Sequence, residues 1–98
     1  MRVIARKRLE EFWRKHWDAK TWLNNWYSVA RHAEWGSLHD VRATFPQADL
    51  VPVGSGKSVT VFNVCGNKYR LAVKIAFNNR TVLIVGAGTH KEYDRWNL

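Results

Sequence analysis

The apolar residues in the first third of the chain recur at the period of a helix. After a short, strand-compatible segment, RVIA at 2–5, one apolar stripe consists of Leu9, Phe12, Trp13, His16 and Trp17. A second stripe consists of Trp22, Trp26, Val29, Ala30 and Ala33, and Gly36 is a suitable end point. Because residues three and four apart share one face of a helix, the stripes predict two amphipathic helices after a first strand.

A third, short helix is predicted directly after these two. The sequence SLHD at 37–40 fits a capping box with Ser37 as the cap and Asp40 in the place of the usual glutamate, and Pro46 would end the helix. Tryptophans are concentrated in this helical part of the chain. Such side chains can stack on bases or bury an interface, but their position on the apolar stripes favours a place in the core.

The second half of the chain has the period of strands. In KYRLAVKIAF at 68–77, apolar and mainly basic positions alternate strictly. Together with SVTVFNVC at 58–65 and TVLIVGAG at 81–88, this segment predicts a three-stranded antiparallel meander. The predicted fold class is therefore α+β, with one domain over residues 1–98 and helices covering the apolar face of the sheet.

Two turn candidates fix the register of this meander. Gly66-Asn67 and Asn78-Asn79 suit two-residue turns, since Gly and Asn tolerate positive φ. The predicted cross-strand pairs are Cys65–Lys68, Asn63–Arg70, Phe62–Leu71, Val61–Ala72, Ile75–Val82, Val73–Ile84, Ala72–Val85 and Lys68–Thr89. One face of the sheet is then apolar, whereas the polar residues of the other face are Asn63, Lys68, Arg70 and Lys74.

A short polar segment, GTHKEYD at 88–94, follows the last predicted strand. Thr89 and Glu92 fit a capping box, T-x-x-E, so a helical turn should begin after Thr89. The residues that share one face of that turn are His90, Tyr93 and Asp94. Because Thr89 is predicted opposite Lys68, these side chains should lie near the basic edge of the sheet at Lys68 and Arg70.

The segment between the helices and the strands contains a misleading motif. GSGKS at 54–58 resembles the end of a phosphate-binding P-loop, but that motif requires a glycine where Val51 stands and a helix afterwards. The residues that follow, VTVFNV, have the pattern of a strand. We therefore interpret Pro52, Gly54, Ser55 and Gly56 as a linker into that strand, with Lys57 as a basic residue near its start.

The charge of the chain narrows the class of partner. Sixteen Lys and Arg residues against eight Asp and Glu residues give a formal net charge of +8, which favours binding to nucleic acid. An acidic protein, a membrane surface or a solvated basic surface without a ligand would also explain it. Cys65, the single cysteine, excludes an internal disulfide framework, and the four histidines lack metal-ligand spacing. Because the sequence shows no signal peptide and no long apolar run, we expect a cytoplasmic protein that is not inserted in a membrane. We also expect that it requires neither a metal nor a cofactor.

His, Tyr, Lys and Arg side chains without a carboxylate pair suit the cleavage of a phosphodiester. Cleavage of RNA without a metal needs a base for the 2′-hydroxyl, an acid for the leaving 5′-oxygen, and cations for the charge on phosphorus. His90 is the natural proton carrier, Arg70 can hold a phosphate in a fork, and Lys68 supplies a point charge. On spacing alone, an equally good interpretation is that His90 and Tyr93 only anchor a terminal helix.

Two motifs together resemble a known family. They are F-N-x-x-G-N-x-x-R-L, within VFNVCGNKYRLAVKI, and G-T-H-x-x-Y-D near the end of the chain. Most of residues 57–94 resembles the HigB-type toxins of bacterial toxin–antitoxin systems, which belong to the RelE/ParE superfamily. The resemblance implies a first strand, two helices and a curved antiparallel sheet. It also implies a small ribonuclease that cuts mRNA, usually in the ribosomal A site, and is neutralised by a helix-turn-helix antitoxin.

The resemblance also implies an active face. Its catalytic residues would be His90, Tyr93, Arg70 and Lys68, and RNA contacts are expected from Lys57, Asn63, Asn67 and Lys74. In the family pattern an arginine often stands four residues before the threonine of G-T-H, where this chain has Val85. The alternative hypothesis is therefore a toxin-like module that binds RNA or its antitoxin but cleaves weakly or not at all. A purely structural protein is a third interpretation.

Overall fold

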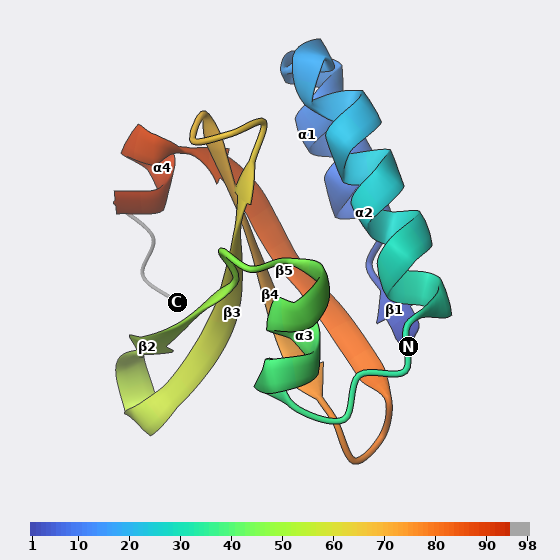
Figure 1. The fold of residues 1–98 in the computed structure, drawn as a ribbon. Coiled ribbons are helices and arrows are strands. Elements are labelled where there is room, and N and C mark those ends of the chain that lie inside the picture. Colours follow the sequence, from blue (N-terminus) through green and yellow to red (C-terminus); the bar gives the residue numbers. More distant parts are fainter. Residues whose placement is uncertain (95–98) are drawn as a thin grey trace.

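A computed structural model describes residues 1–94 of the protein, apart from the side chains of Ser55 and Asp94. Five strands form one sheet in the order β1-β5-β4-β3-β2 (Figure 1). The strands are β1 (Arg2–Ile4), β2 (Asp49–Val53), β3 (Lys57–Val64), β4 (Tyr69–Ala76) and β5 (Thr81–Thr89). The helices are α1 (Lys7–Lys15), α2 (Lys20–His32), α3 (Leu38–Thr44) and α4 (His90–Asp94), with 3₁₀ turns η1 (Trp17–Ala19) and η2 (Gly54–Gly56). The predicted α+β fold class is confirmed.

The core lies between one face of the sheet and the N-terminal helices. Figure 1 shows α1 and α2 together on one side of the sheet, whereas α4 lies on the other side. The fully buried side chains of this core include Leu9, Leu23, Trp26, Phe62, Leu71, Val73, Val82 and Ile84. Helices therefore cover the apolar face of the sheet, as predicted. Within residues 1–94, the helices are all too short or too polar to span a membrane.

The tryptophans divide between the core and the surface. Trp13, Trp26 and Trp35 are buried, which confirms the core interpretation for these three. Trp17 is 66% exposed, so its predicted place on the first apolar stripe is wrong. The reason is that α1 ends at Lys15 and His16 leaves helical geometry, with φ −134° and ψ 71°, so the four-residue spacing from Trp13 no longer sets a common face.

The segment around α3 differs from the prediction at its N-cap and in the residues that follow the helix. Ser37 occupies the N-cap position, but its side chain makes no capping hydrogen bond; instead, the main-chain N–H of Gly36 donates to Asp40 Oδ2 at 2.8 Å. The helix ends before Pro46, as expected. Residues 49–53 form β2, antiparallel to β3, so Pro52 lies in a strand and not in a linker. A proline is tolerated there because β2 is an edge strand.

The predicted register of the meander is confirmed for β3–β4 and for the part of β4–β5 that precedes one irregularity in β5. The pairs Asn63–Arg70, Phe62–Leu71, Val61–Ala72, Val73–Ile84 and Ile75–Val82 are as predicted. Between Ala72 and Val73 the ladder shifts, so that Ala72 faces Gly86 and Tyr69 faces Thr89. The predicted pairs Ala72–Val85 and Lys68–Thr89 are therefore wrong, because Val85 is an extra residue in a β-bulge.

The turn between β3 and β4 is also wider than predicted. Pairing ends at Val64–Tyr69, which leaves residues 65–68 in the turn and removes the predicted Cys65–Lys68 pair. Positive φ angles occur at Cys65 (54°) and Gly66 (72°), not at Gly66 and Asn67. The turn thereby presents the main-chain carbonyl of Asn67 to other parts of the molecule, where it accepts hydrogen bonds.

Arg8 of α1 stabilises the bulge in β5. Pairing between β1 and β5 ends at Leu83, so the next carbonyls of β5 have no strand partner on that edge. Nη1 of Arg8 donates to the carbonyl oxygens of Ile84 at 2.8 Å and Val85 at 3.2 Å. The Val85 side chain packs with the small apolar cluster of Val59, Val61 and Ala72.

Candidate active site

The C-terminal helix α4 begins where the sequence predicts, because the capping box at Thr89 and Glu92 forms in both directions. The N–H of Thr89 donates to Glu92 Oε1 at 3.0 Å, and the N–H of Glu92 donates to Thr89 Oγ1 at 3.2 Å. The first of these bonds lowers the pKa of the Glu92 carboxyl, since it stabilises the charged form. The box thus sets the position of His90 and Tyr93 relative to the end of β5.

The carbonyl oxygen of Asn67 brings His90 and Arg70 together. Nε2 of His90 donates to this oxygen, and Nη1 of Arg70 lies 3.4 Å from it and 3.1 Å from the carbonyl oxygen of Tyr69. A carbonyl oxygen only accepts, so Nε2 of His90 must carry a proton. Nδ1 of His90 is then the ring nitrogen that remains for proton exchange, and the described residues provide it with no hydrogen-bond partner.

Tyr93 connects α4 to the basic face of the sheet. The guanidinium carbon of Arg70 lies 5.8 Å from the centre of the Tyr93 ring, within the range of a cation–π interaction. The same ring packs against the cluster of Val59, Val61 and Ala72. Tyr93 therefore anchors α4 through its apolar packing and also contacts Arg70. These contacts are compatible both with a role in anchoring the terminal helix and with a role in catalysis.

A surface hollow of about 270 Å³ adjoins Arg70 and Tyr93. Its lining residues are Gln47, Asp49, Val51, Val61, Asn63, Arg70 and Tyr93. Asn63 was a predicted RNA contact, and its Nδ2 donates to Gln47 Oε1 at 2.9 Å. Asp49 adds a carboxylate that the sequence analysis did not foresee, and it forms an ion pair with Arg42 at 3.5 Å. The hollow combines a guanidinium, a phenol ring and two amides, which suits a phosphate and its neighbouring sugar.

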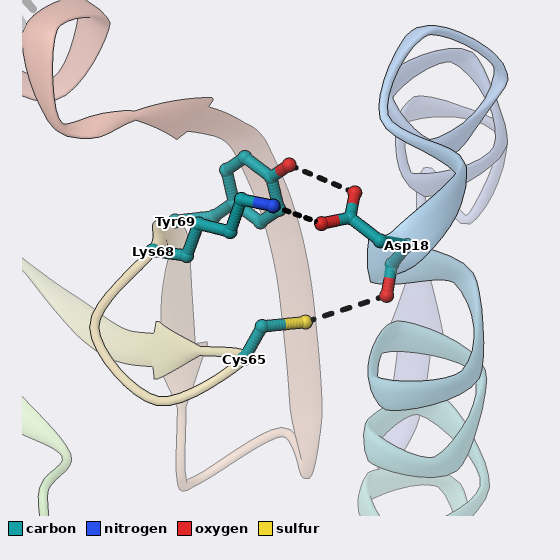
Figure 2. A network of polar contacts seen from close by, with 4 residues as sticks. All are labelled: Asp18, Cys65, Lys68 and Tyr69. Atoms are coloured by element: carbon teal, nitrogen blue, oxygen red, sulfur yellow. Dashed lines mark hydrogen bonds and ion pairs between the residues drawn. The ribbon is translucent and has the colours of Figure 1, made fainter.

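Lys68 points away from this group of residues. Figure 2 shows its side chain reaching toward η1, where Nζ donates to the carboxylate of Asp18. The hydroxyl of Tyr69 donates to the same carboxylate at 2.8 Å, and the Cys65 thiol lies 3.5 Å from the main-chain oxygen of Asp18 (Figure 2). Asp18 therefore connects the helical layer to Cys65 and Lys68 of the β3–β4 turn and to Tyr69 at the start of β4.

This network shifts the pKa values of its members. The hydrogen bond from Lys68 and then that from Tyr69 lower the pKa of the Asp18 carboxyl. The hydrogen bond to Asp18 raises the pKa of Lys68, whereas the pKa of Tyr69 is raised chiefly by burial. At neutral pH, Asp18 and Lys68 are thus both charged, and the ion pair between them is present.

The remaining predicted site residues lie outside the hollow. Lys57 and Lys74 are exposed, at the start of β3 and in β4, and Asn67 contributes its carbonyl oxygen while its side chain is exposed. The side chain of Asp94 lies outside the described part of the chain. Among the described side chains, His, Cys, Asp and Glu residues form no cluster that could hold a metal ion. Sequence reasoning missed Asp18, because its partners are separated from it by about 50 residues.

A comparison with protein families identifies the class of molecule. The family model HigB_toxin, described as the RelE-like toxic component of a toxin-antitoxin system, matches residues 19–96. The chain belongs to this family. The matched segment includes Asn67, Arg70, His90 and Tyr93, whereas Asp18 lies just before it. The family predicted from the two motifs is therefore confirmed, and a HigB toxin implies an antitoxin as its partner.

One curated relative supports the same assignment. The protein named mRNA interferase HigB from Escherichia coli O6:H1, strain CFT073, is 26% identical to this HigB toxin over 95 residues. The alignment covers 97% of this chain and 90% of the relative. The similarity therefore extends over the helices as well as the sheet.

We expect the capping box to control the order of α4. Replacing Thr89 by alanine removes the side-chain acceptor and should cost on the order of 1 kcal/mol of local helix stability. Amide hydrogen exchange at residues 91–93 should then be about fivefold faster, because a local opening of α4 exposes these amides. Thr89→Ser keeps the hydroxyl and serves as the control. Equal protection in Thr89→Ala and the wild type would show that the box does not hold α4.

We expect the Asp18 network to make stability depend on pH. A carboxyl whose pKa is lowered on folding stabilises the folded state above its unfolded pKa of about 3.9. That contribution is lost as the pH falls through the lowered folded pKa of Asp18. The Tm of the wild type should therefore exceed that of Asp18→Asn at neutral pH, and the difference should disappear in strong acid. Glu34→Gln, at an exposed position, is the matched control; a difference that persists unchanged in acid would contradict the prediction.

Proposed function

We propose that this HigB toxin is a metal-independent endoribonuclease that cleaves mRNA in the cytoplasm, on the ribosome, and thereby inhibits translation. The main support is that one carbonyl oxygen, that of Asn67, accepts hydrogen bonds from both His90 and Arg70. A proton carrier and a phosphate-binding fork thus lie next to each other, beside Tyr93. The name of the Escherichia coli relative, mRNA interferase, supports the same reaction.

The proposed reaction is attack of a 2′-hydroxyl on the adjacent phosphorus. Nδ1 of His90 takes the proton of the 2′-hydroxyl, and the oxygen forms a bond to phosphorus while the bond to the 5′-oxygen breaks. The 5′-oxygen leaves with a proton, and the products are a 2′,3′-cyclic phosphate and a 5′-hydroxyl. Arg70 binds the phosphate oxygens through Nε and Nη2, for which the described residues provide no hydrogen-bond partner. Tyr93 positions the phosphate or donates the final proton.

The other predicted residues receive supporting roles. Lys68 reaches a phosphate only after it leaves Asp18, so the first phosphate contact is assigned to Arg70 and Lys68 assists. Asn63 lines the hollow beside Arg70 and contacts the RNA there. Lys57, Asn67 and Lys74 are exposed and extend the RNA contact along the sheet and its turn. The net charge of +8 makes this contact salt-dependent.

The proposed antitoxin carries a helix-turn-helix domain and blocks the basic face. Acidic or apolar side chains placed over Arg70 and the hollow would exclude RNA directly. An antitoxin that packs on the N-terminal helices, where Trp17 is largely exposed, would instead act at a distance. Co-expression of the toxin with a cognate antitoxin tests this proposal. The antitoxin should restore growth and co-purify with the toxin, whereas a toxin without a partner would show neither effect.

We expect His90→Gln to abolish cleavage but not binding. Loss of general acid–base catalysis costs on the order of 10²–10⁴ in rate, and His90 is exposed, so the fold should be retained. Cleavage of ribosome-bound mRNA and of free RNA, RNA affinity and Tm should be measured together, with and without EDTA. The control is His39→Gln, at an exposed position in α3. Full activity in His90→Gln, or loss of wild-type activity in EDTA, would contradict the proposed reaction.

A second candidate function is a module that binds RNA or its antitoxin but cleaves weakly. It is favoured by Val85, which stands where the family pattern often has an arginine, and by Asp49, whose carboxylate lines the hollow. The Val85 side chain lies on the same face as Tyr93, in the same apolar cluster. A cation introduced at position 85 would thus be added to the proposed active face.

We therefore expect Val85→Arg to increase the rate of RNA cleavage, because a second guanidinium would stabilise the charge on phosphorus. Ala43→Arg adds the same charge at an exposed position in α3, away from this face, and should leave the rate nearly unchanged. Initial cleavage rates at equal RNA occupancy provide the measurement. Equal rates in both variants would assign the effect to overall charge and not to the active face.

A further inference from the structure

A second hollow, of about 310 Å³, lies between α2, the segment after α3, and β3. It is lined mainly by apolar side chains, among them Trp22, Phe45 and Phe62, with Gln47 and Asn63 as amides. Small-molecule pockets in proteins typically have about 300–1,000 Å³ and combine an apolar wall with a few polar groups. The hollow is therefore large enough for a flat heterocycle but small for a folded peptide segment.

The apolar wall is built from aromatic rings that support one another. The Trp22 and Phe45 rings lie 6.2 Å apart, and Phe45 contacts Phe62 edge-on at 5.3 Å. Phe62 is buried in the core, whereas Trp22 and Phe45 are only half-buried and keep part of their surface toward the hollow. A half-exposed ring held in place by a buried one can stack on a base with little loss of side-chain entropy.

The amides of Gln47 and Asn63 give this hollow a donor and an acceptor. Nδ2 of Asn63 donates to Oε1 of Gln47 at 2.9 Å. This bond leaves the Nε2 group of Gln47 as a donor and Oδ1 of Asn63 as an acceptor, neither with a partner among the described residues. A neighbouring donor and acceptor match the edge of a nucleobase, which offers the complementary pair.

The two hollows are neighbours, because Gln47 and Asn63 line both of them. Asn63 lies directly opposite Arg70 in the β3–β4 ladder. The amides of Gln47 and Asn63 therefore lie between the aromatic rings and Arg70, the proposed phosphate site. We propose that the aromatic hollow binds one unstacked nucleobase of single-stranded RNA while Arg70 binds a neighbouring phosphate. This assignment rests on the proposed function and adds a base-recognition subsite to it.

An RNA base fits the observations better than an apolar side chain of the antitoxin. The basic chain attracts a polyanion, and the aromatic hollow shares Gln47 and Asn63 with the hollow lined by Arg70, whose guanidinium can hold the phosphate of the same strand. Under an apolar side chain, the remaining donor of Gln47 (Nε2) and the remaining acceptor of Asn63 (Oδ1) would have no partner, which costs free energy. A base satisfies both groups and covers the rings.

The test measures the binding of short single-stranded RNA that cannot be cleaved. Hexamers of A, C or U with 2′-fluoro groups are titrated into the protein, and an abasic hexamer with the same backbone reports binding to phosphates alone. In the wild type, the hexamers with bases should bind more tightly than the abasic one. Trp22→Leu keeps an apolar side chain but removes the stacking ring, and should reduce the affinity for the base-containing hexamers by about 5- to 150-fold. Its affinity for the abasic hexamer should not change.

Two further variants make the result decisive. Trp17→Leu is the same substitution at a tryptophan that is 66% exposed and lines neither hollow, and it should bind like the wild type. Gln47→Ala, at an exposed position, should alter the preference among A, C and U even if Trp22→Leu does not fold. If Trp22→Leu or Gln47→Ala binds every hexamer like the wild type, the base subsite is wrong.

The outcomes separate this inference from the proposed function. A wild type that cleaves RNA, while both variants bind and cleave normally, overturns the base subsite and leaves the ribonuclease proposal intact. A wild type that binds neither the hexamers nor the abasic backbone overturns the base subsite, whereas the ribonuclease proposal is overturned by a wild type that does not cleave ribosome-bound mRNA. If Trp22→Leu weakens the complex with the antitoxin but not that with RNA, the hollow belongs to the protein partner, and the proposal is also overturned.

Discussion

The turn between β3 and β4 is the constraint on which the candidate site depends. On the helix side, Asp18 accepts hydrogen bonds from Lys68 and Tyr69. On the opposite side, the carbonyl oxygen of Asn67 accepts hydrogen bonds from His90 and Arg70. Because the same turn makes both sets of contacts, the helical layer and the C-terminal helix are coupled through its backbone. The exposed ion pair adds little energy by itself, so its role is to fix geometry.

The bulge at Val85 decides where the start of α4 lies relative to β4. An extra residue in one strand shifts every later pair by one position, so Thr89 faces Tyr69 and α4 starts one residue further along the sheet. Arg8 satisfies the carbonyl oxygens that the bulge and the short β1 leave without strand partners. The same irregularity keeps the Val85 side chain in the apolar cluster beneath Tyr93. Val85 and Tyr93 thus pack against the same three buried residues, and the Tyr93 ring also contacts Arg70.

The two faces of the sheet separate the main core from the candidate active site. The face under α1 and α2 holds the large buried side chains and is closed to solvent. The other face has only a small apolar cluster of valines and Ala72, which leaves room for charged and amide groups around it. Substitutions at exposed residues of this second face should therefore have little effect on the fold. The hollow at Arg70 lies on this face, and it shares Gln47 and Asn63 with the aromatic hollow between α2, the segment after α3, and β3.

The sequence by itself determined the helices, the three central strands, most of their pairing register and the capping box of α4. These features depend on local spacing: apolar periods set the faces, and Thr89 and Glu92 are only three residues apart. The family also followed from short motifs. Only the tertiary structure decided that residues 49–53 pair as an edge strand, that Lys68 turns toward Asp18, and that Asn67 holds His90. Those contacts join residues far apart in the chain, and no local pattern records which side chains folding brings together.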